Sequence, residues 1–265
     1  MRIMPFTLRP FGLFFIATMA LSGCGETPWY EKDTDGDDIL DVIDDYPFDA
    51  TKHHYPVFIE QEPNDNPGIA TPAKLDDGFI AAGTISSRVD KGDLFGFDAS
   101  EGTMITAFFT TQAERFSPQV YISNADGLVI DSYVMKPFSK DGTYVVHFQL
   151  FKAGRYQLSV MDNNYAGGDD LSYKITVFHD TDVDAFDDRK ERRLLSDVSK
   201  NDQDNDGIID GLEYLLTRSV KLLDADNDGQ FNWQDDDSDG DGTADKQEGK
   251  LDKNNNGQPD FLEKN

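Results

Sequence analysis

The sequence predicts a mainly β protein, in which an antiparallel β-sandwich is followed by calcium-loop repeats with short helices. Two observations carry this prediction. Residues 55–178 contain short runs in which apolar and polar side chains alternate, as they do in half-buried strands. Residues 179–265 contain five twelve-residue segments whose first, third and fifth residues all have oxygen-bearing side chains, which is the spacing of Ca²⁺-binding loops.

The first residues have the organisation of a bacterial lipoprotein signal peptide. Arg2 and Arg9 form a basic start, and the apolar run at 11–21 is shorter than the ~20 residues that span a bilayer. The tetrapeptide Leu-Ser-Gly-Cys that ends at Cys24 resembles the lipobox, which is cleaved before a cysteine whose thiol accepts a diacylglycerol. We therefore expect residues 1–23 to be removed and Cys24 to carry a stable membrane anchor of several acyl chains.

The alternative is an ordinary signal peptide with an incidental cysteine. Cys24 is the single cysteine of the chain, so an intrachain disulfide is excluded, and it lies within four residues of the end of the apolar run. Gly25 follows it, where lipoproteins kept in the inner membrane have aspartate. By that resemblance we expect a cell-envelope location, as an outer-membrane lipoprotein on the periplasmic face or the cell surface.

The alternating runs within residues 55–178 predict seven or eight strands. Aromatic and β-branched residues are enriched in the alternating runs, and Gly, Asn and Asp separate runs that recur about every ten residues. A segment of about 120 residues suffices for one sandwich core. The runs lie at 95–97, 105–109, 120–122, 129–133, 144–148, 156–160 and 173–177.

Several motifs of this segment match one family. The E-Q-E-P-N-D at 60–65 matches an E-x-E-P-N-D opening, and G-T-I at 83–85 matches a G-x-I strand. D-L-F-G-F at 93–97 matches D-Y-F-x-F, with leucine in place of tyrosine, and 154–160 matches G-x-Y-x-L-x-V. The segment 57–178 thus resembles the bacterial pre-peptidase C-terminal domain, a jelly-roll-like sandwich that is usually appended to secreted peptidases.

The resemblance also implies a calcium site in the sandwich. In collagen-binding relatives of the family, the acidic opening and an Asp-x-x-Asp before the aromatic strand share Ca²⁺. The alternative is that Asn64 and Asp65 cap a turn and that Asp93 begins a strand. The residues at the matching positions are Glu60, Glu62, Asn64, Asp65, Asp90 and Asp93.

Four twelve-residue loops of the acidic part match the calcium-loop pattern closely. Ca²⁺ takes 6–8 oxygens, which such loops supply from positions 1, 3, 5, 9 and 12 and from the carbonyl of position 7, with glycine at position 6. We expect weaker binding at 252–263, where two ligands are amides, and at 224–235, where position 12 is the shorter aspartate. The candidate ligands are Asp202, Asp204, Asp206, Ile208 (carbonyl), Asp210 and Glu213; Asp224, Asp226, Asp228, Asn232 and Asp235; Asp237, Asp239, Asp241, Asp245 and Glu248; and Asp252, Asn254, Asn256, Asp260 and Glu263.

Two further loops keep the ligand spacing without the glycine. Asp38 and Ala185 stand at position 6, where a β-carbon disfavours a positive φ by about 1 kcal/mol or more. The alternative for all these loops is a solvated acidic tail, which would not keep glycine and acidic residues at fixed offsets. The ligands of these two loops are Asp33, Asp35, Asp37, Asp41 and Asp44, and Asp180, Asp182, Asp184, Asp188 and Glu191.

The distances between loops predict how they are connected. The starts at 180, 202 and 224 are 22 residues apart, which leaves room for a short helix whose apolar side would include Leu212, Tyr214 and Leu216. The next spacings of 13 and 15 leave no such room, so these loops must stack nearly end to end. The runs at 237–245 and 33–41 resemble thrombospondin type 3 repeats without their cysteines, and the 22-residue pair is similar to dockerin repeats.

The charge of the chain fits this interpretation. The chain has 51 acidic and 24 basic residues, and residues 179–265 alone hold 25 acidic and 11 basic ones. Carboxylates ~4 Å apart repel by about 1–4 kcal/mol, so this segment should be extended without a cation and should fold when metal binds. The excess of acid argues against nucleic-acid binding. It fits an extracytoplasmic setting with millimolar Ca²⁺.

The function predicted from these features is that of a calcium-binding, lipid-anchored module for binding, adhesion or structural support. We expect no enzyme, since the chain lacks G-x-S-x-G and H-E-x-x-H motifs, and G-G-D-D at 167–170 and the pair His53–His54 fit a plain loop and a surface pair. The expected partners are the membrane and an extracellular protein or polysaccharide. The alternatives are an accessory of a secreted peptidase and a dockerin-like scaffold module. The predicted parts are a signal peptide at 1–23, a linker with one degenerate loop at 24–54, the sandwich at 55–178 and the calcium-binding repeats at 179–265.

Overall fold

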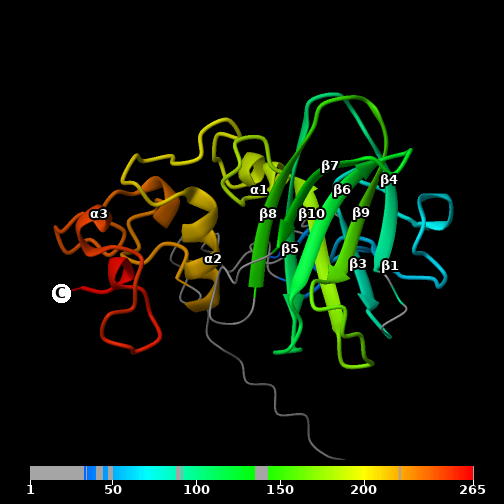
Figure 1. Ribbon diagram of the computed structural model, residues 1–265. Coiled ribbons are helices and arrows are strands. Elements are labelled where there is room, and N and C mark those ends of the chain that lie inside the picture. The colour runs from blue at the N-terminus through cyan, green and yellow to red at the C-terminus, as the bar shows by residue number, and fades with distance from the viewer. Residues whose placement is uncertain are drawn as a thin grey trace, which may run out of the picture.

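A computed structural model describes residues 33, 35–39, 44–46, 50–87, 90, 92–134, 143–220 and 222–264. The predicted signal peptide, the predicted lipidation residue Cys24 and the loop residue Asp41 lie outside this part of the chain. A β-sandwich forms one half of the described structure, and a segment of loops and short helices forms the other (Figure 1).

Two five-stranded sheets make up the sandwich. All strand pairs are antiparallel except β1–β3 and β2–β4, which are parallel. The first sheet has the order β1 (Val57–Ile59), β3 (Phe79–Thr84), β10 (Ser172–His179), β5 (Thr103–Thr111) and β8 (Thr143–Leu150). The second has the order β2 (Thr71–Pro72), β4 (Asp93–Ala99), β9 (Gly154–Asp162), β6 (Pro118–Asn124) and β7 (Val129–Val134).

The core of the sandwich follows from the alternation in the sequence. On β5, Ile105, Ala107 and Phe109 are fully buried, because successive side chains of a strand point to opposite faces. The ring of Phe109 stacks on Tyr173 of β10 with the ring centroids 5.5 Å apart. Residues from both sheets join a single apolar cluster, so the predicted mainly β sandwich is confirmed.

The strand count and the strand pairing both differ from the prediction. The described structure has ten strands rather than seven or eight, and two of its pairs are parallel. β1 and β2 have three and two residues, which is too short for a period of two to be recognised. Their partners, β3 and β4, follow them by about twenty residues, a pairing that local sequence patterns do not reveal.

Short helices follow or close the acidic loops, which we name L1 (33–44), L2 (180–191), L3 (202–213), L4 (224–235), L5 (237–248) and L6 (252–263). The helix predicted after L3 is present as α2 (Asp210–Val220), which begins at position 9 of that loop. L2 ends in the shorter α1 (Asp188–Arg193). The later loops contain single turns at their ends: η3 (Asn232–Gln234), α3 (Asp245–Glu248) and η4 (Asp260–Leu262). A further turn, η2 (Pro67–Ile69), lies in the sandwich.

Helix α2 lies between two small apolar clusters. On one side Tyr214 stacks on Phe186 of L2 with the ring centroids 4.4 Å apart, and Trp233 of L4 is fully buried beside both rings. The second cluster joins Leu212 of α2 to Phe261 of L6. The last loop therefore folds back onto the helix, so that α2 holds loops from both ends of the acidic segment.

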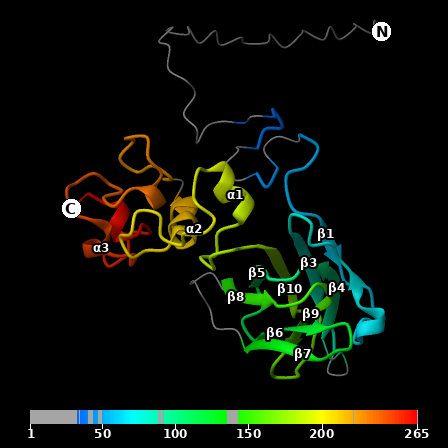
Figure 2. The same ribbon diagram turned by 90° about the horizontal axis from the view of Figure 1, so that it is seen from above.

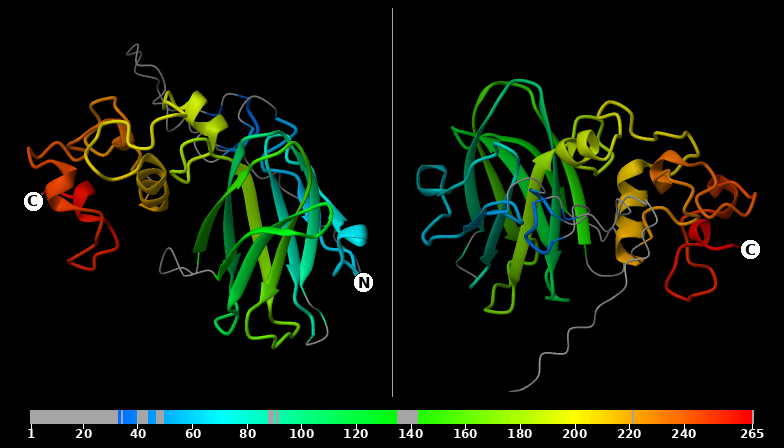
Figure 3. Two further views of the ribbon diagram at one scale, coloured as in Figure 1. Left: turned by 45° about the horizontal axis from the view of Figure 1, so that its top comes forward. Right: turned by 180° about the vertical axis from the view of Figure 1, so that it is seen from behind.

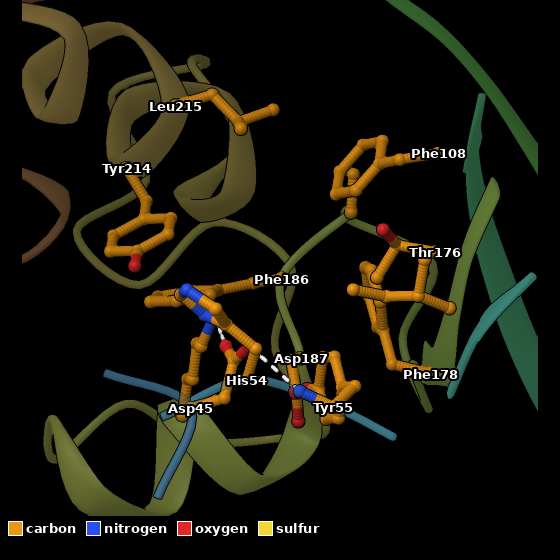
Figure 4. A pocket seen from close by; sticks show the side chains of 13 residues that line it. Asp45, His54, Tyr55, Phe108, Thr176, Phe178, Phe186, Asp187, Tyr214 and Leu215 are labelled. Carbon is orange, nitrogen blue, oxygen red and sulfur yellow. Dashed lines mark hydrogen bonds and ion pairs between the residues drawn. The ribbon is translucent and has the colours of Figure 1, made fainter. Parts of the chain in front are cut away.

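The acidic segment meets the sandwich at the end of β10. Asp180, the first residue of L2, follows β10 directly, and its Oδ2 accepts a hydrogen bond from the hydroxyl of Thr106 on β5. A cavity of about 190 Å³ lies at this junction, with Tyr214 and Leu215 of α2 on one side and Phe108 and Phe178 of the sandwich on the other (Figure 4). In the views of Figures 2 and 3 the described part of L1 lies next to α1.

Candidate metal centres

All six loops are closed by the same hydrogen bond. The carboxylate at position 1 accepts from the backbone N–H of position 6, which turns the four intervening residues around a common centre. The distances are 2.9 Å from Asp33 to Asp38, 3.0 Å from Asp180 to Ala185, 3.1 Å from Asp202 to Gly207, 3.2 Å from Asp224 to Gly229, 3.0 Å from Asp237 to Gly242 and 3.0 Å from Asp252 to Gly257.

This closure requires a positive φ at two positions. Position 6 has φ between 71° and 101° in every loop, including Asp38 of L1 and Ala185 of L2. Position 4 has φ between 59° and 79° and is Asn or Gly in all loops except L2, where Val183 has φ 67°. Val183 is β-branched and Ala185 has a β-carbon, and both lie in the left-handed region, so L2 holds two strained residues.

The turns at positions 3 and 5 direct oxygens to the centre of the loop. In L3, Asp204 Oδ1 accepts from the N–H of Asp206 at 3.0 Å, and Asp206 Oδ1 accepts from the N–H of Ile208 at 2.6 Å. The other oxygen of each carboxylate, and Oδ1 of Asp202, are buried without a hydrogen-bond partner among the described residues. Local backbone contacts therefore occupy one oxygen of each pair and leave the other oxygen for a ligand.

The centre of L3 is completed from helix α2. One oxygen from each of Asp202, Asp204 and Asp206 lies within 4.8 Å of the others, a spacing that suits an ion bound at 2.3–2.6 Å. Glu213 at position 12 is fully buried, and within the described structure neither of its carboxylate oxygens has a hydrogen-bond partner. This oxygen set fits a hard cation such as Ca²⁺.

L1 and L2 build the same arrangement without a glycine at position 6. Their first three aspartates meet the same 4.8 Å criterion. In L2 both oxygens of Asp182 and of Glu191 are buried and, in the described part of the protein, make no hydrogen bond. In L1 this holds for both oxygens of Asp35 and for Oδ2 of Asp44. The two degenerate loops therefore keep the inward-facing oxygens that their spacing predicts.

Burial and mutual repulsion raise the pKa values of several buried carboxyl groups in L2 and L3. The pKa of Glu213 is raised to about 12, first by burial and then by the charges of Asp204 and Asp206. Burial, with Asp184 as the strongest neighbouring charge, raises the pKa of Glu191 to about 9. The pKa of Asp204 rises to about 7, again mainly through burial. The ionised forms of these three groups are therefore disfavoured unless a cation compensates their charge.

The position-9 residues, all predicted as ligands, have another role in the described loops. In L3 Asp210 accepts from the N–H of Gln203 at 2.6 Å and from the hydroxyl of Ser196 at 2.7 Å. Both oxygens are thus occupied, and a position-9 residue of this kind reaches an ion through water. The same bond to position 2 is made by Asp188 to Thr181 (2.7 Å), Asn232 to Ala225 (3.0 Å), Asp245 to Ser238 (2.9 Å) and Asp260 to Lys253 (2.9 Å).

The last three loops differ in how free their ligands are. In L4 Asp235 Oδ1 accepts from the N–H of Asp237, so position 12 is drawn toward the start of L5. In L6 Glu263 accepts from the side-chain amides of Asn254 and Asn256. These internal bonds occupy oxygens of the position-12 residues in L4 and L6, where weaker binding stays a prediction. The remaining candidate ligands of these loops lie in the turns, except Glu248, which ends α3; those in the turns are Asp226, Asp228, Asp237, Asp239, Asp241 and Asp252.

The acidic residues of the sandwich also meet in space. Oxygens of Glu60, Glu62 and Asp93 lie within 4.8 Å of one another, and so do those of Glu62, Asp65 and Asp90. Burial, together with Glu60, raises the pKa of Asp93 to about 9. Asn64 next to this cluster is fully buried, and neither polar atom of its side chain has a partner in the described structure.

The G-G-D-D segment and the pair His53–His54, which the sequence did not favour as functional sites, take part in ion pairs. Asp170 of the G-G-D-D segment pairs with Arg115, and His53 pairs with Asp37 of L1. In the described residues no helix has both the length and the apolar character needed to cross a membrane.

No family model matches the sequence, and none of the curated proteins searched is similar to it. Solved structures similar to the sandwich have low identities. The pre-peptidase C-terminal domain of a Bacillus anthracis collagenase is 14% identical, with 44% of this chain and 98% of that domain covered and a TM-score of 0.33. A Salmonella Typhimurium periplasmic inhibitor of g-type lysozyme is 17% identical (41% and 95% covered, TM-score 0.30). The surface-associated copper-binding protein CorA of Methylomicrobium album is 9% identical (42% and 97% covered, TM-score 0.28).

Proposed function

We propose that this chain is a calcium-binding, lipid-anchored protein of the cell envelope that acts as a non-enzymatic module for binding, adhesion or structural support. The observation that carries the proposal is the repeated loop geometry. In L1, L2 and L3 the position-1 carboxylate closes the loop, while buried carboxylate oxygens face its centre without a partner among the described residues.

Bound calcium would supply the positive charge that these oxygens require. An ionised carboxyl group that is fully buried and unpaired costs several kcal/mol, and it neutralises itself by taking a proton unless a cation is present. A Ca²⁺ site in each loop would bind the ionised form and would release protons as it fills. The hard oxygen ligands favour calcium over thiolate- or imidazole-binding metals.

Calorimetric titration of the full-length protein in detergent with Ca²⁺ tests the proposal. We expect binding at several sites, accompanied by proton release and by a gain of ordered structure in circular dichroism. Titration with Mg²⁺ serves as the control, because Mg²⁺ demands a smaller octahedral site and keeps its waters. A protein that binds no Ca²⁺, or whose acidic segment resists proteases equally well in EDTA, would contradict the proposal.

The anchor is the part of the proposal that comes from the sequence alone. Replacing the lipidation residue, Cys24→Ser, should release the protein from the membrane fraction. Unchanged membrane fractionation would argue for another mode of attachment, and protease treatment of intact cells would distinguish the cell surface from the periplasmic face.

The sandwich is the proposed binding part. One end of it exposes Leu128 and Phe151, which are 68% and 61% accessible, beside a depression of about 410 Å³ that also includes Arg155. Exposed apolar residues gathered around a depression support an interaction surface for an extracellular protein or a polysaccharide. Loss of a partner from pull-downs when Leu128 and Phe151 are both changed to serine would support this assignment, and retention would argue against it.

A further inference from the structure

The N-terminal loop L1 is fastened to the helix of a loop that lies far from it in the sequence. Asp45 directly follows L1, and its Oδ1 is 2.7 Å from Nζ of Lys190 on α1. The backbone carbonyl of Asp44 accepts a hydrogen bond from Arg193 at 3.4 Å. The guanidinium of Arg189 also lies over the ring of Tyr46, 4.5 Å from its centroid. Three contacts thus join one end of L1 to α1.

The same helix completes L2. Position 12 of L2 is Glu191, so the helix that supplies this candidate ligand also holds the end of L1. Lys190 precedes Glu191, and Asp45 follows Asp44, which is position 12 of L1. The ion pair therefore connects the two residues that adjoin the position-12 carboxylates of both loops.

Each loop of this pair contains oxygens that a cation would satisfy. Asp44 and Glu191 are fully buried. Oδ2 of Asp44 and both oxygens of Glu191 have no hydrogen-bond partner in the part of the chain that the structure describes. The pair Asp45–Lys190 is itself nearly buried, with each residue 8% accessible, so solvent screens it little.

The contact between L1 and α1 joins two segments that lie at opposite ends of the sandwich sequence. L1 precedes the first strand, β1, and L2 follows the last strand, β10. Contacts between the two loops therefore join the two chain ends of the sandwich. Tyr55, at the start of the sandwich, takes part as well, because its N–H donates to Asp45 Oδ2 at 3.2 Å and Arg189 lies 4.9 Å from its ring.

We propose that L1 and L2 bind two calcium ions as a coupled pair, and that the ion of L2 keeps the N-terminal segment attached to α1. This inference rests on the calcium-binding function proposed above. An ion in L2 draws Glu191 toward the loop centre and fixes α1, which places Lys190 for Asp45 and thereby places Asp44 in L1. Because coupling between two sites is reciprocal, an ion in L1 raises the affinity of L2 by the same factor.

Trypsin cleavage after Lys52, in the exposed stretch between L1 and the sandwich, reports on this attachment in the full-length protein. The rate is measured by mass spectrometry of the fragments, in EDTA and in saturating Ca²⁺. We expect Ca²⁺ to slow cleavage. In Lys190→Met the ratio of the cleavage rate in EDTA to that in Ca²⁺ should be about tenfold smaller, a factor within the usual range of coupling between sites. Lys174→Met on β10, an exposed position, removes the same charge and is the matched control.

A second variant tests the direction of the coupling. Glu191→Gln removes a ligand of L2 but no residue of L1, and it should expose Lys52 more than Glu213→Gln, which removes the equivalent residue of L3. Equal protection in wild type and Lys190→Met, or equal effects of the two glutamine variants, would overturn the coupling. If calorimetry still detects calcium binding in that case, the proposed function stands; if it detects none, both proposals are wrong.

Discussion

Glu213→Gln should change the stability of the protein in opposite directions with and without calcium. The side chain is fully buried in L3, and the structure describes no hydrogen-bond partner for either oxygen. Its pKa is raised to about 12, first by burial and then by the charges of Asp204 and Asp206. Without a cation the buried glutamate destabilises the folded protein at neutral pH. With a cation it is a ligand that glutamine does not replace.

The sign of the pH dependence follows from linkage. In the calcium-free protein the folded state holds the proton of Glu213 more tightly than the unfolded state, whose pKa is about 4.5. The stability that this group contributes is therefore fully present below about pH 4.5 and is lost as the pH rises toward the folded pKa. Three pH units above the unfolded value correspond to about 4 kcal/mol, an upper limit because neighbouring groups titrate together.

The substitution removes this pH dependence but introduces a buried amide. An unsatisfied polar group costs about 1–3 kcal/mol, so in EDTA at about pH 7.5 we expect a net gain of about 1–3 kcal/mol in the free energy of unfolding. In calcium the variant loses a charged ligand. A hundredfold weaker site lowers the stabilisation by bound ligand by about 2.7 kcal/mol.

Urea unfolding, followed by the fluorescence of the buried Trp233, measures both effects between about pH 5 and 8. Glu263→Gln in L6 is the control, because that glutamate is partly exposed and already accepts hydrogen bonds from Asn254 and Asn256. The reasoning fails if Glu213→Gln is less stable than wild type in EDTA at about pH 7.5. It also fails if the stability of the wild type in EDTA does not decrease as the pH rises.

Three further substitutions follow from the same structure. Val183→Asn places at position 4 of L2 the residue that L3, L4 and L6 have there, so it should relieve strain and raise the urea midpoint, by about 1 kcal/mol in free energy; no change would show that Val183 is unstrained. Gly83→Ala brings a Cβ to 2.6 Å from the hydroxyl of Tyr173 and 2.8 Å from Asp93 Oδ2, so thermal unfolding should show a loss of about 1–3 kcal/mol; tolerance would mean that the sandwich cluster can open. Asp93→Asn removes a carboxyl whose pKa is about 9, so the calcium-free sandwich should lose less stability between about pH 5 and 8; an unchanged melting profile would contradict that pKa.

The first half of each loop could be predicted from the sequence because it is built from contacts five residues apart or less. The hydrogen bond from position 1 to position 6, and the turns at positions 3 and 5, depend on residue types at fixed offsets. The closing role of position 9 was missed. Its signal is the short polar residue at position 2 of L2 and L5, Thr181 and Ser238, whose hydroxyls also donate to the position-9 carboxylate.

A second local signal was present but unused. Position 4 has a positive φ in all six loops, and Gly36, Asn205, Asn227, Gly240 and Asn255 are the residue types that tolerate it. Gly36 at position 4 would therefore have strengthened the prediction of L1 despite its Asp38. In L2 both positions break the rule, which marks it as the loop whose surroundings must impose its conformation.

Longer-range features could not be derived in this way. The parallel pairing of β1 with β3, the attachment of L1 to α1 and the packing of Phe261 against α2 join residues that no local period links. Strand alternation specifies which side chains face the core, but it does not specify which strands are neighbours. Those choices depend on the total burial and the loop closure of the whole chain.

The packing of the acidic segment refines the idea that metal alone would organise it. Two clusters with buried aromatic residues, one around Trp233 and one around Phe261, hold the loops to α2. They comprise nine buried residues of the described segment, against twenty-three in the core of the sandwich. These apolar clusters do not neutralise the acidic side chains buried beside them, such as the fully buried Asp210, Glu191 and Glu213. The clusters therefore determine how the loops are arranged, while the stability of that arrangement at neutral pH requires protons or a cation on the carboxylates.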